Sequence, residues 1–221
     1  MIKLIHTGPF GVNTLIVSIG GSDVFIVDPA SCDFSGDRTA VTAYLAASGL
    51  VPKAVVLTHG HFDHVAGISF LKECYPGLPA LIHRDDASLI GKNSGVLQSR
   101  GLSYMGFEEF VPFVSNLPEP TAFLEDNALL SDYFSCSESG DWHVIHTPGH
   151  TKGSCCLFNS KENILISGDC VFYRSFGRTD LPGGNDFEMR QSLLRLRNEI
   201  PANALVYPGH DRTGFCFSEN F

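Results

Sequence analysis

The stretch THGHFDH, at residues 58–64, predicts both the fold and the chemistry of this chain. It directly follows the apolar run AVVL at 54–57, which is typical of a buried strand. His59 and His61 are two residues apart, so in extended backbone both imidazoles project to the same side and can converge on one cation. Asp63 and His64 lie beyond the turn, where they can face a second cation. The spacing therefore predicts a metal centre at the end of a strand.

Further potential ligands each follow a glycine at the end of another strand-like run: His150 in TPGHTKGS, Asp169 in LISGDCVF and His210 in LVYPGHD. A ligand at a strand end is held by the sheet, and the neighbouring glycine lets the backbone turn close to the metal. Two cations need about seven protein ligands and one open position for a reactive water. We therefore predict two divalent metal ions bound by His59, His61, Asp63, His64, His150, Asp169 and His210.

Short β-branched runs alternate with helical patterns along the chain. In the first half we expect strands at 15–19, 24–28, 54–58 and 80–83, a helix over 37–49 and a similar segment at 64–77. In the second half we expect strands at 142–147, 154–158, 163–169 and 204–209 and a helix over about 186–198. Residues 84–135 show only helical turns near 86–90 and 107–113. Two strand-rich halves, each followed by helix, predict two packed sheets with helices outside.

Length, charge and cysteine content exclude several classes of protein. A chain of 221 residues with 43% apolar residues fits one domain spanning 1–221. The net charge of -9 opposes attraction to nucleic acid or to an anionic membrane, and no stretch approaches the roughly 18 to 20 apolar residues of a membrane span. The N-terminus lacks the unbroken apolar run of a secretory signal. The cysteines, at 32, 74, 136, 155, 156, 170 and 216, form no C-x-x-C pair, which favours reduced thiols in a cytoplasmic protein.

The ligand order H-x-H-x-D-H, then H, D and H, is similar to that of the metallo-β-lactamase superfamily. Within it, FGVNTLIV, IVDPA, HTPGHTKGS, SGDCVF and FGRTDLPGG resemble the short glyoxalase II-like thioesterases, the hydroxyacylglutathione hydrolases and their relatives. This resemblance implies an α/β protein folded as a four-layer αββα sandwich.

The same resemblance assigns a role to each site residue. It implies that His59, His61 and His150 bind the first metal, that Asp63, His64 and His210 bind the second, and that Asp169 bridges both. Asp28, in IVDPA, corresponds to a family aspartate that supports a metal ligand from behind, although an ordinary turn before Pro29 is nearly as good an explanation.

The activity that the resemblance implies is hydrolysis of a small S-acyl-glutathione-like thioester by a metal-bound hydroxide, which Asp63 and Asp169 would orient. A thiolate leaves with little protonation because thiol pKa values are only about 8.5. Oxygen-reducing di-iron members of the superfamily carry Glu where this chain has His61, so His61 favours hydrolysis. We expect zinc, with iron or manganese as alternatives. Neither nucleic acid nor a membrane is an expected partner, and the oligomeric state stays open.

Two other activities stay open. A persulfide dioxygenase resembles this chain in the histidine motif and the YPGHD-x-x-G run, and it would hold a single iron on His59, His150 and Asp169. The LPGG segment at 181–184 is more similar to the thioesterases. A hydrolase of another ester, such as a lactone or a phosphoester, is the other alternative, because the fold hosts many chemistries.

The chain differs from full-length glyoxalase II after its last predicted ligand. We therefore expect no helical domain of the kind that carries glutathione contacts in that family, and residues 84–135 are expected to supply a substitute wall. We expect the aromatic residues of this stretch to pack in the core rather than line a pocket: Tyr104, Phe107, Phe110 and Phe113. The histidines without ligand partners at fitting spacing are expected at the surface or satisfied in the core: His6, His83, His143 and His146.

Overall fold

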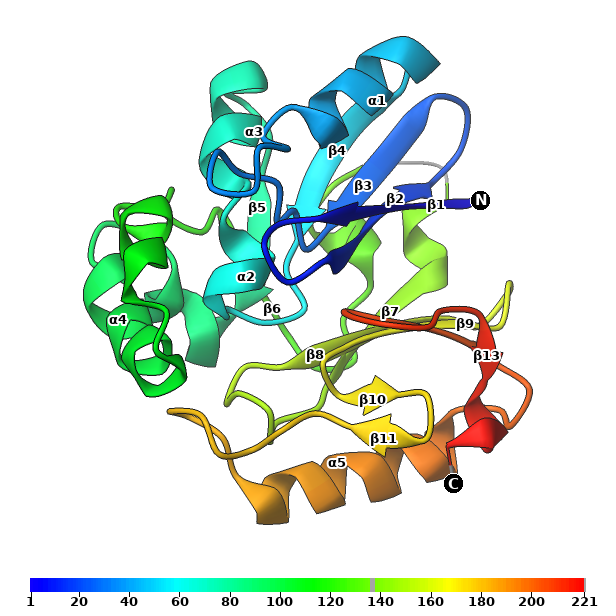
Figure 1. Cartoon of the computed structure of the whole chain (residues 1–221). Coiled ribbons are helices and arrows are strands. Elements are labelled where there is room, and N and C mark those ends of the chain that lie inside the picture. The colour runs from blue at the N-terminus through cyan, green and yellow to red at the C-terminus, as the bar shows by residue number, and fades with distance from the viewer. Residues whose placement is uncertain (136–137, 221) are drawn as a thin grey trace.

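The computed structural model describes residues 1–135 and 138–220, so Cys136 lies outside the described residues. Two β-sheets face each other in the middle of the molecule, and helices cover their outer faces (Figure 1). The N-terminal sheet has the strand order β1-β2-β3-β4-β5-β6, and the C-terminal sheet has the order β13-β12-β9-β8-β7. This arrangement confirms the predicted αββα sandwich.

The strands of the N-terminal sheet are β1 (Ile2–Thr7), β2 (Val12–Ser18), β3 (Asp23–Val27), β4 (Val51–Val56), β5 (Ala80–His83) and β6 (Ala122–Leu124). Those of the C-terminal sheet are β7 (Trp142–His146), β8 (Cys155–Asn159), β9 (Ile164–Gly168), β12 (Leu205–Pro208) and β13 (Phe215–Cys216). A small ribbon is formed by β10 (Val171–Phe172) and β11 (Ser175–Phe176). The predicted strands are therefore present with slightly shifted ends, whereas β1, β6, β10, β11 and β13 were not predicted.

The α-helices are α1 (Ala40–Ser48), α2 (Phe62–Val65), α3 (Ile68–Cys74), α4 (Ser94–Met105) and α5 (Asp186–Glu199). Short 3-10 turns complete the chain: η1 (Arg84–Leu89), η2 (Glu108–Val114), η3 (Leu130–Asp132), η4 (Ser139–Asp141) and η5 (Phe217–Glu219). The predicted segment at 64–77 is divided at Gly67, where an added Cβ would lie 2.7 Å from the Pro29 carbonyl oxygen. The prediction also missed α4, whereas the predicted turns near 86–90 and 107–113 correspond to η1 and η2.

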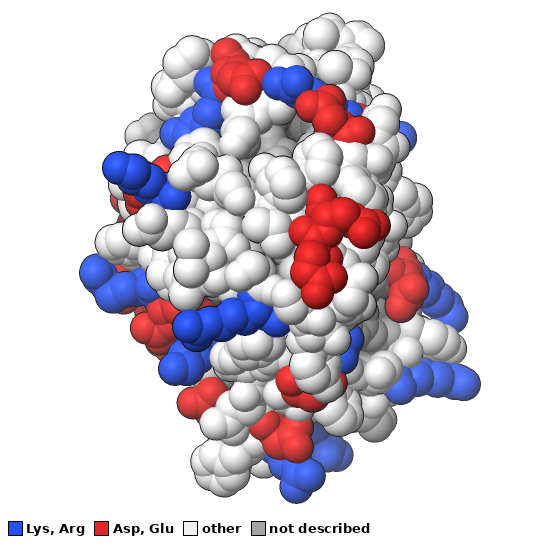
Figure 2. Space-filling view, turned by 60° about the vertical axis from the view of Figure 1, so that its left-hand side comes forward, with Lys and Arg blue, Asp and Glu red and all other residues white. Residues whose placement is uncertain are grey.

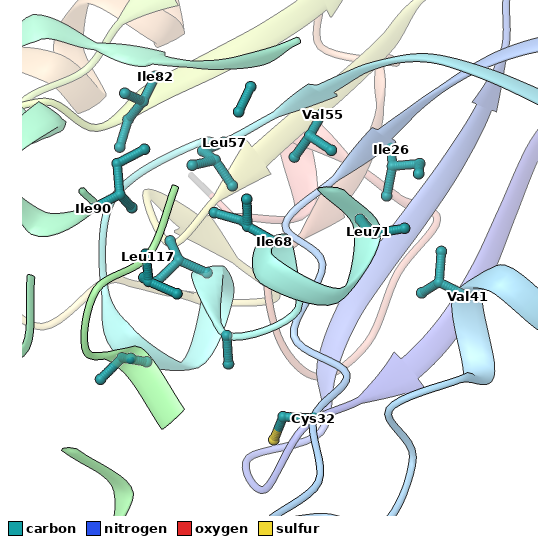
Figure 3. Packing of buried hydrophobic residues seen from close by; sticks show 14 of the residues in the cluster. Ile26, Cys32, Val41, Val55, Leu57, Ile68, Leu71, Ile82, Ile90 and Leu117 are labelled. Atoms are coloured by element: carbon teal, nitrogen blue, oxygen red, sulfur yellow. The ribbon is translucent and has the colours of Figure 1, made fainter. Parts of the chain in front are cut away.

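Alternation along the strands of the N-terminal sheet separates two layers of core. Ile26 and Val55 point outward and pack beneath α1 and α3 (Figure 3), and Ile16 belongs to the same cluster. Their neighbours in sequence point inward and pack against the other sheet, where the Phe25 and Trp142 rings meet edge to face at 5.4 Å. Trp142 is therefore a packing residue.

Helix α5 covers the outer face of the C-terminal sheet (Figure 1). It begins at Asn185, whose side-chain oxygen accepts hydrogen bonds from the backbone N–H groups of Phe187 (2.9 Å) and Glu188 (3.1 Å). The side chains of Met189 and Leu196 lie on the same face of this helix and are buried against the sheet. No helix in the described part of the chain is long and apolar enough to cross a bilayer.

Strand direction brings the carboxyl ends of several strands to one edge of the sandwich. β3, β4 and β5 run parallel to one another, and β9 runs parallel to β12. The segments that follow these strands include Asp28, the 58–64 stretch, Asp169 and His210. Neighbouring parallel strands end side by side, so residues far apart in the sequence meet at this edge.

Asp126, in the loop after β6, joins this loop to α5. Its carboxylate accepts hydrogen bonds from Arg195 Nη1 (2.9 and 3.0 Å) and from the backbone N–H of His146 (2.8 Å). Burial opposes ionisation of Asp126, but these hydrogen bonds outweigh it and lower the pKa of the carboxyl below its usual value.

We expect Asp126→Asn to lower the free energy of unfolding by about 0.5 to 1 kcal/mol near neutral pH, a range set by the solvent exposure of the ion pair. A depressed folded-state pKa contributes stability above the unfolded-chain value of about 3.9 and loses it as the pH falls through the folded value. Urea unfolding across pH should therefore show the difference between the two proteins shrinking below about pH 4. A difference that stays constant into acid would contradict this explanation.

Candidate metal centre

Three histidines from the two halves of the chain converge in a first cluster. His59 and His61 come from the loop after β4, and His150 comes from the loop after β7. One ring nitrogen from each lies within 4.8 Å of the others, and His61 Nδ1 lies 2.8 Å from His150 Nε2. Imidazoles bound to one cation place their nitrogens about 3 Å apart, because each metal–nitrogen bond is about 2.0–2.1 Å. The three rings are therefore arranged as ligands of one cation would be.

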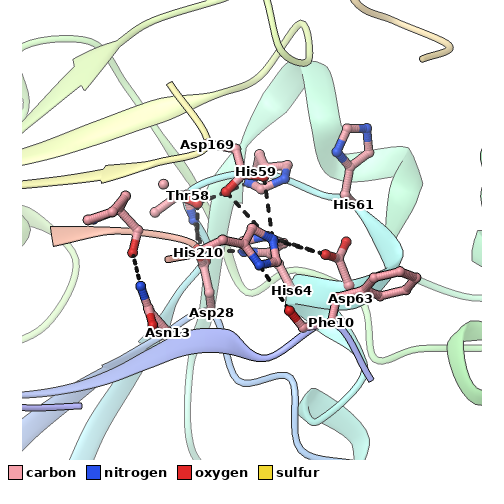
Figure 4. Close-up of polar contacts among 12 residues, drawn as sticks. Phe10, Asn13, Asp28, Thr58, His59, His61, Asp63, His64, Asp169 and His210 are labelled. Carbon is pink, nitrogen blue, oxygen red and sulfur yellow. Dashed lines mark hydrogen bonds and ion pairs between the residues drawn. The ribbon is translucent and has the colours of Figure 1, made fainter. Parts of the chain in front are cut away.

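A second cluster lies beside the first and is formed by Asp63, His64 and His210. The Nε2 atoms of His64 and His210 are 3.1 Å apart, and His210 Nε2 lies 3.2 Å from Asp63 Oδ2 (Figure 4). Asp63 and His64 are in the short helix α2, and His210 follows β12. This cluster can hold a second cation.

Asp169 lies between the two clusters. Its Oδ2 is 3.5 Å from His150 Nε2 and 3.6 Å from His210 Nε2, and its Oδ1 is 3.5 Å from His64 Nε2. One carboxylate thus faces both groups of imidazoles. The structure brings together all the side chains that the sequence predicts as metal ligands, and their assignment as ligands is our proposal.

Glycine next to a ligand is required where the site is most crowded. An added Cβ at Gly209 would lie 2.6 Å from His64 Cε1 and would also overlap Asp169 Oδ1. Gly168 has a φ of +48°, which lies in the left-handed region. Residues other than glycine adopt this conformation only at a cost in free energy. The glycines before His210 and Asp169 therefore permit the close approach of the loops.

Oxygen atoms behind the histidines orient most of the rings. His150 Nδ1 donates to the Arg178 carbonyl oxygen (2.7 Å), and His210 Nδ1 donates to the Phe10 carbonyl oxygen (3.3 Å). Each contact leaves Nε2 directed at the cluster, since the hydrogen bond at one nitrogen fixes the proton position. His61 is oriented differently, because its Nδ1 faces the cluster.

Asp28 holds the loop of the 58–64 stretch from behind. Its Oδ2 accepts hydrogen bonds from His64 Nδ1 (3.0 Å) and Thr58 Oγ1 (2.6 Å), and its Oδ1 accepts one from the Thr58 backbone N–H (2.8 Å). The Thr58 hydroxyl oxygen lies 3.1 Å from His59 Nδ1 and can accept a hydrogen bond from it. Asp28 has a φ of +48°, an uncommon conformation for a residue with a side chain. Its contacts are those of an aspartate that supports two metal ligands.

Two imidazoles of the first cluster, His59 and His61, are neutral. Burial and then the neighbouring His64 lower the pKa of His59 well below its usual value. Burial and then His150 lower the pKa of His61 to about 3. A neutral imidazole has a free lone pair, so both side chains are ready to bind a cation at neutral pH.

The second cluster attracts positive charge. Burial opposes charge on His64, but Asp169 and Asp63 outweigh it and raise the pKa of His64 well above its usual value. Burial likewise opposes ionisation of Asp169, yet His64 holds the pKa of this carboxyl well below its usual value. Without a metal, a proton on His64 thus balances the carboxylates, and metal binding must displace it.

Buried polar atoms without hydrogen-bond partners also indicate a site for divalent cations. His59 Nε2 and Asp169 Oδ1 are buried and have no hydrogen-bond partner within the described residues. A buried polar atom without a partner is costly, and a bound cation would satisfy both atoms. Imidazole and carboxylate together suit zinc, iron or manganese, so the donor set agrees with the prediction of divalent metal and leaves its identity open.

Asp86, which the sequence analysis did not select, joins the two ligand loops. It lies in η1, is 2% exposed, and accepts hydrogen bonds from the backbone N–H groups of Gly60 (2.8 Å) and Gly153 (2.8 Å) and from Thr151 Oγ1 (2.7 Å). Gln98 in α4 donates to the Gly60 carbonyl oxygen (2.6 Å). Both peptide groups of Gly60 are therefore fixed. An acidic residue shortly after a strand, as at Asp28, is the one signal that could have identified Asp86.

His83 and His146, which were expected at the surface or satisfied in the core, contact each other across the two sheets. Their rings stack at 3.9 Å with an interplanar angle of 10°, and Asp85 Oδ2 lies 3.8 Å from His83 Nδ1. Ring nitrogens carry their lone pairs in the ring plane, so parallel rings do not direct them at one point. We therefore do not assign a metal to this group.

A cavity of about 350 Å³ opens over the two clusters. Its polar side is formed by His61, Asp63, His150, Asp169 and His210, and its apolar side by Phe10, Phe62, Met105, Phe172 and Leu181. Phe110 is fully buried, as expected, and Phe107 and Phe113 pack partly against the same core. Tyr104 is 61% exposed and donates to Asp180 (3.2 Å), so the expectation of core packing is wrong for this residue.

Comparison with known proteins supports the same kind of site. A sequence model of the metallo-beta-lactamase superfamily matches residues 7–210. The probable metallo-hydrolase YqgX of Bacillus subtilis (strain 168) is 31% identical over 211 residues, which are 92% of this chain and 86% of that protein. The B3 metallo-beta-lactamase BLEG-1 has a TM-score of 0.82 at 26% identity and covers 99% of this chain and 95% of its own. TTHA1623, solved in a di-iron-bound form, has a TM-score of 0.79 at 28% identity, with 98% and 96% covered.

We expect Asp169→Ala to lower metal content from about two ions per chain to one or fewer, because the carboxylate faces both clusters. Elemental analysis of purified protein measures this loss. Asp141→Ala is the control, since Asp141 contacts the exposed Lys161 (3.4 Å) and should keep the wild-type content. Full metal content in the Asp169 variant would remove Asp169 from the ligand set.

We expect Asp86→Asn to weaken metal binding by about 10- to 100-fold, because an amide nitrogen cannot accept the hydrogen bonds that orient the two loops. Competition with a coloured chelator measures this affinity. Asp37→Asn is a matched control: Asp37 also accepts two backbone N–H groups, from Gly8 (2.7 Å) and Cys32 (2.9 Å), in a different loop. Equal metal affinities in the two variants would show that Asp86 has no special role.

Proposed function

The chain belongs to the metallo-β-lactamase superfamily, and from this premise we propose that it is a dinuclear metal-dependent hydrolase that cleaves a small-molecule thioester. The probable metallo-hydrolase name of its Bacillus subtilis relative supports the hydrolase class. The thioester is proposed from the FGRTDLPGG and HTPGHTKGS segments, which resemble glyoxalase II-like enzymes. The acyl group and the thiol are not specified by these segments.

The composition of the cavity carries the proposal. Imidazoles and carboxylates of both clusters line it, whereas its described lining includes no serine, cysteine or lysine that could form a covalent intermediate. This lining favours hydrolysis by an activated water. Bound divalent cations would lower the pKa of a water molecule towards about 7 and polarise a carbonyl oxygen.

The chain's own residues position this chemistry. Asp63 and Asp169 carry carboxylates at the floor of the cavity, where they can accept a hydrogen bond from the attacking water and hold its lone pair towards the substrate. Phe10, Met105 and Phe172 form an apolar wall that limits access of bulk water. None of these five side chains is an obvious general acid for a leaving group. A thiolate leaves with little protonation, because the pKa of a thiol is only about 8.5, so it suits this cavity better than an alkoxide.

Arg178 is an exposed residue that lines the cavity over the two clusters. Its guanidinium is bound by Asp180 through two hydrogen bonds, Nε to Oδ1 (2.7 Å) and Nη2 to Oδ2 (2.8 Å). Arg178 and Asp180 of the GRTD segment therefore form an ion pair. Because the Arg178 carbonyl oxygen also accepts from His150 Nδ1, this loop both limits the entrance and orients a ring of the site.

A persulfide dioxygenase with a single iron is the second candidate. It would use His59, His150 and Asp169 and would leave Asp63, His64 and His210 without a function. The close grouping of these three side chains favours the hydrolase over the dioxygenase. The di-iron form of TTHA1623 keeps iron among the metals to be tested.

We expect the protein loaded with zinc, iron or manganese to hydrolyse S-lactoylglutathione or another S-acyl thioester without consuming oxygen. Release of free thiol and oxygen uptake with glutathione persulfide are measured in parallel on the same preparation. Oxygen uptake without thiol release would reject the hydrolase in favour of the dioxygenase.

His64→Ala and His210→Ala separate the two candidates further. Both variants remove ligands of the second cluster and should reduce thioester hydrolysis by at least about 100-fold, in the range of lost metal catalysis. A mononuclear dioxygenase would retain most of its oxygen uptake in the same variants.

A further inference from the structure

A second cavity, of about 290 Å³, lies next to the cavity over the metal clusters. The two cavities share His61, Phe62 and Leu181 in their linings. The second is bounded by α4 on one side and by residues 181–183 on the other. A molecule whose reacting end lies over the clusters can therefore extend past His61 into the second cavity.

Two cationic side chains line the second cavity. Arg100 comes from α4, and Lys152 follows His150 by two residues. Both are exposed, and in the part of the chain that the structure describes neither side chain has a hydrogen bond or an ion pair. The Lys152 backbone is fixed, because its carbonyl oxygen accepts from His146 Nε2 (2.8 Å).

Within the described residues, the carboxylates of the same cavity, Asp85 and Asp86, form no ion pair with these cations. Asp86 already accepts the hydrogen bonds from Gly60, Gly153 and Thr151 described above. Asp85 lies 3.8 Å from His83. By contrast, Arg178 at the first cavity is bound by Asp180. Of the described cationic side chains that line these two cavities, those free to bind an external anion are therefore in the second.

The charges around this cavity favour a small ligand. Figure 2 brings the α4 side of the molecule forward and shows basic and acidic side chains intermixed around a largely uncharged middle. There is no broad basic field on this face for a polyanion to follow. An overall charge of -9 also repels anions, so an anionic substrate needs local cations to bind.

We propose that the second cavity binds a terminal anionic group, a carboxylate or a phosphate, of a substrate whose scissile acyl bond lies in the first cavity. Arg100 and Lys152 are then the residues that select the substrate. The proposal rests on the proposed hydrolase function, and it narrows the substrate class to thioesters whose thiol or acyl part ends in an anion.

The test uses metal-loaded protein and substrates that differ only at one end: the S-acetyl thioesters of mercaptohexanoate, mercaptohexyl phosphate and mercaptohexanol. We expect wild-type protein to prefer an anionic thioester over the neutral one, and the carboxylate and phosphate compounds identify the preferred anion. Arg100→Gln and Lys152→Gln should each lower the ratio of anionic to neutral kcat/KM by about fivefold to tenfold. Arg100→Lys keeps the charge and should retain most of the preference.

Arg190→Gln is the matched control, because Arg190 is an exposed arginine on α5 outside both cavities. Its anionic preference should equal that of wild type. Added salt should reduce the preference in wild type, since these cations are exposed. Equal preference in wild type, Arg100→Gln and Lys152→Gln would overturn the proposal and leave the hydrolase function intact.

Binding of uncleavable thioethers separates failure of this proposal from failure of the hydrolase function. Calorimetric titration measures the affinities of ethylthiohexanoate, ethylthiohexyl phosphate and ethylthiohexanol. An anionic thioether that binds wild type more tightly than the neutral one, and loses this advantage in Arg100→Gln, supports the anion site even if no thioester is cleaved. Equal affinities for all three compounds would reject it.

Discussion

The metal centre depends on hydrogen bonds that hold the imidazole rings from behind. Asp28 orients His64, and the Arg178 and Phe10 carbonyl oxygens orient His150 and His210. These oxygens belong to loops from both sheets, so no single segment can orient the site by itself. The rings keep their directions only while the two sheets are packed together, and the buried layer between the sheets is therefore part of the site's construction.

The ligands could be predicted from sequence because each stands at the end of an apolar strand, mostly beside a glycine. This pattern depends on local backbone geometry, and local geometry is encoded by neighbouring residues. The two layers of core follow from alternation along the strands for the same reason. Helix α4 was missed because Gly95 and Gly101 interrupt its helical pattern, and only its tertiary contacts stabilise it.

The supporting residues could not be predicted in this way. Asp86 acts on backbone N–H groups of Gly60 and Gly153, and no side-chain motif records a contact of this kind. His83 and His146 approach only after the two sheets pack, so spacing along the chain gives no sign that they meet. The prediction thus identified the clustered side chains and, through the family resemblance, Asp28 behind them, but it missed Asp86 and the pair of His83 and His146.

The division of ligands between the halves has a consequence for biosynthesis. During synthesis, the 58–64 stretch leaves the ribosome long before His150, Asp169 and His210. Until these later residues emerge, the imidazoles of the stretch lack the other predicted ligands. Stable capture of cations must wait for the later segments, so synthesis and metal loading occur in sequence.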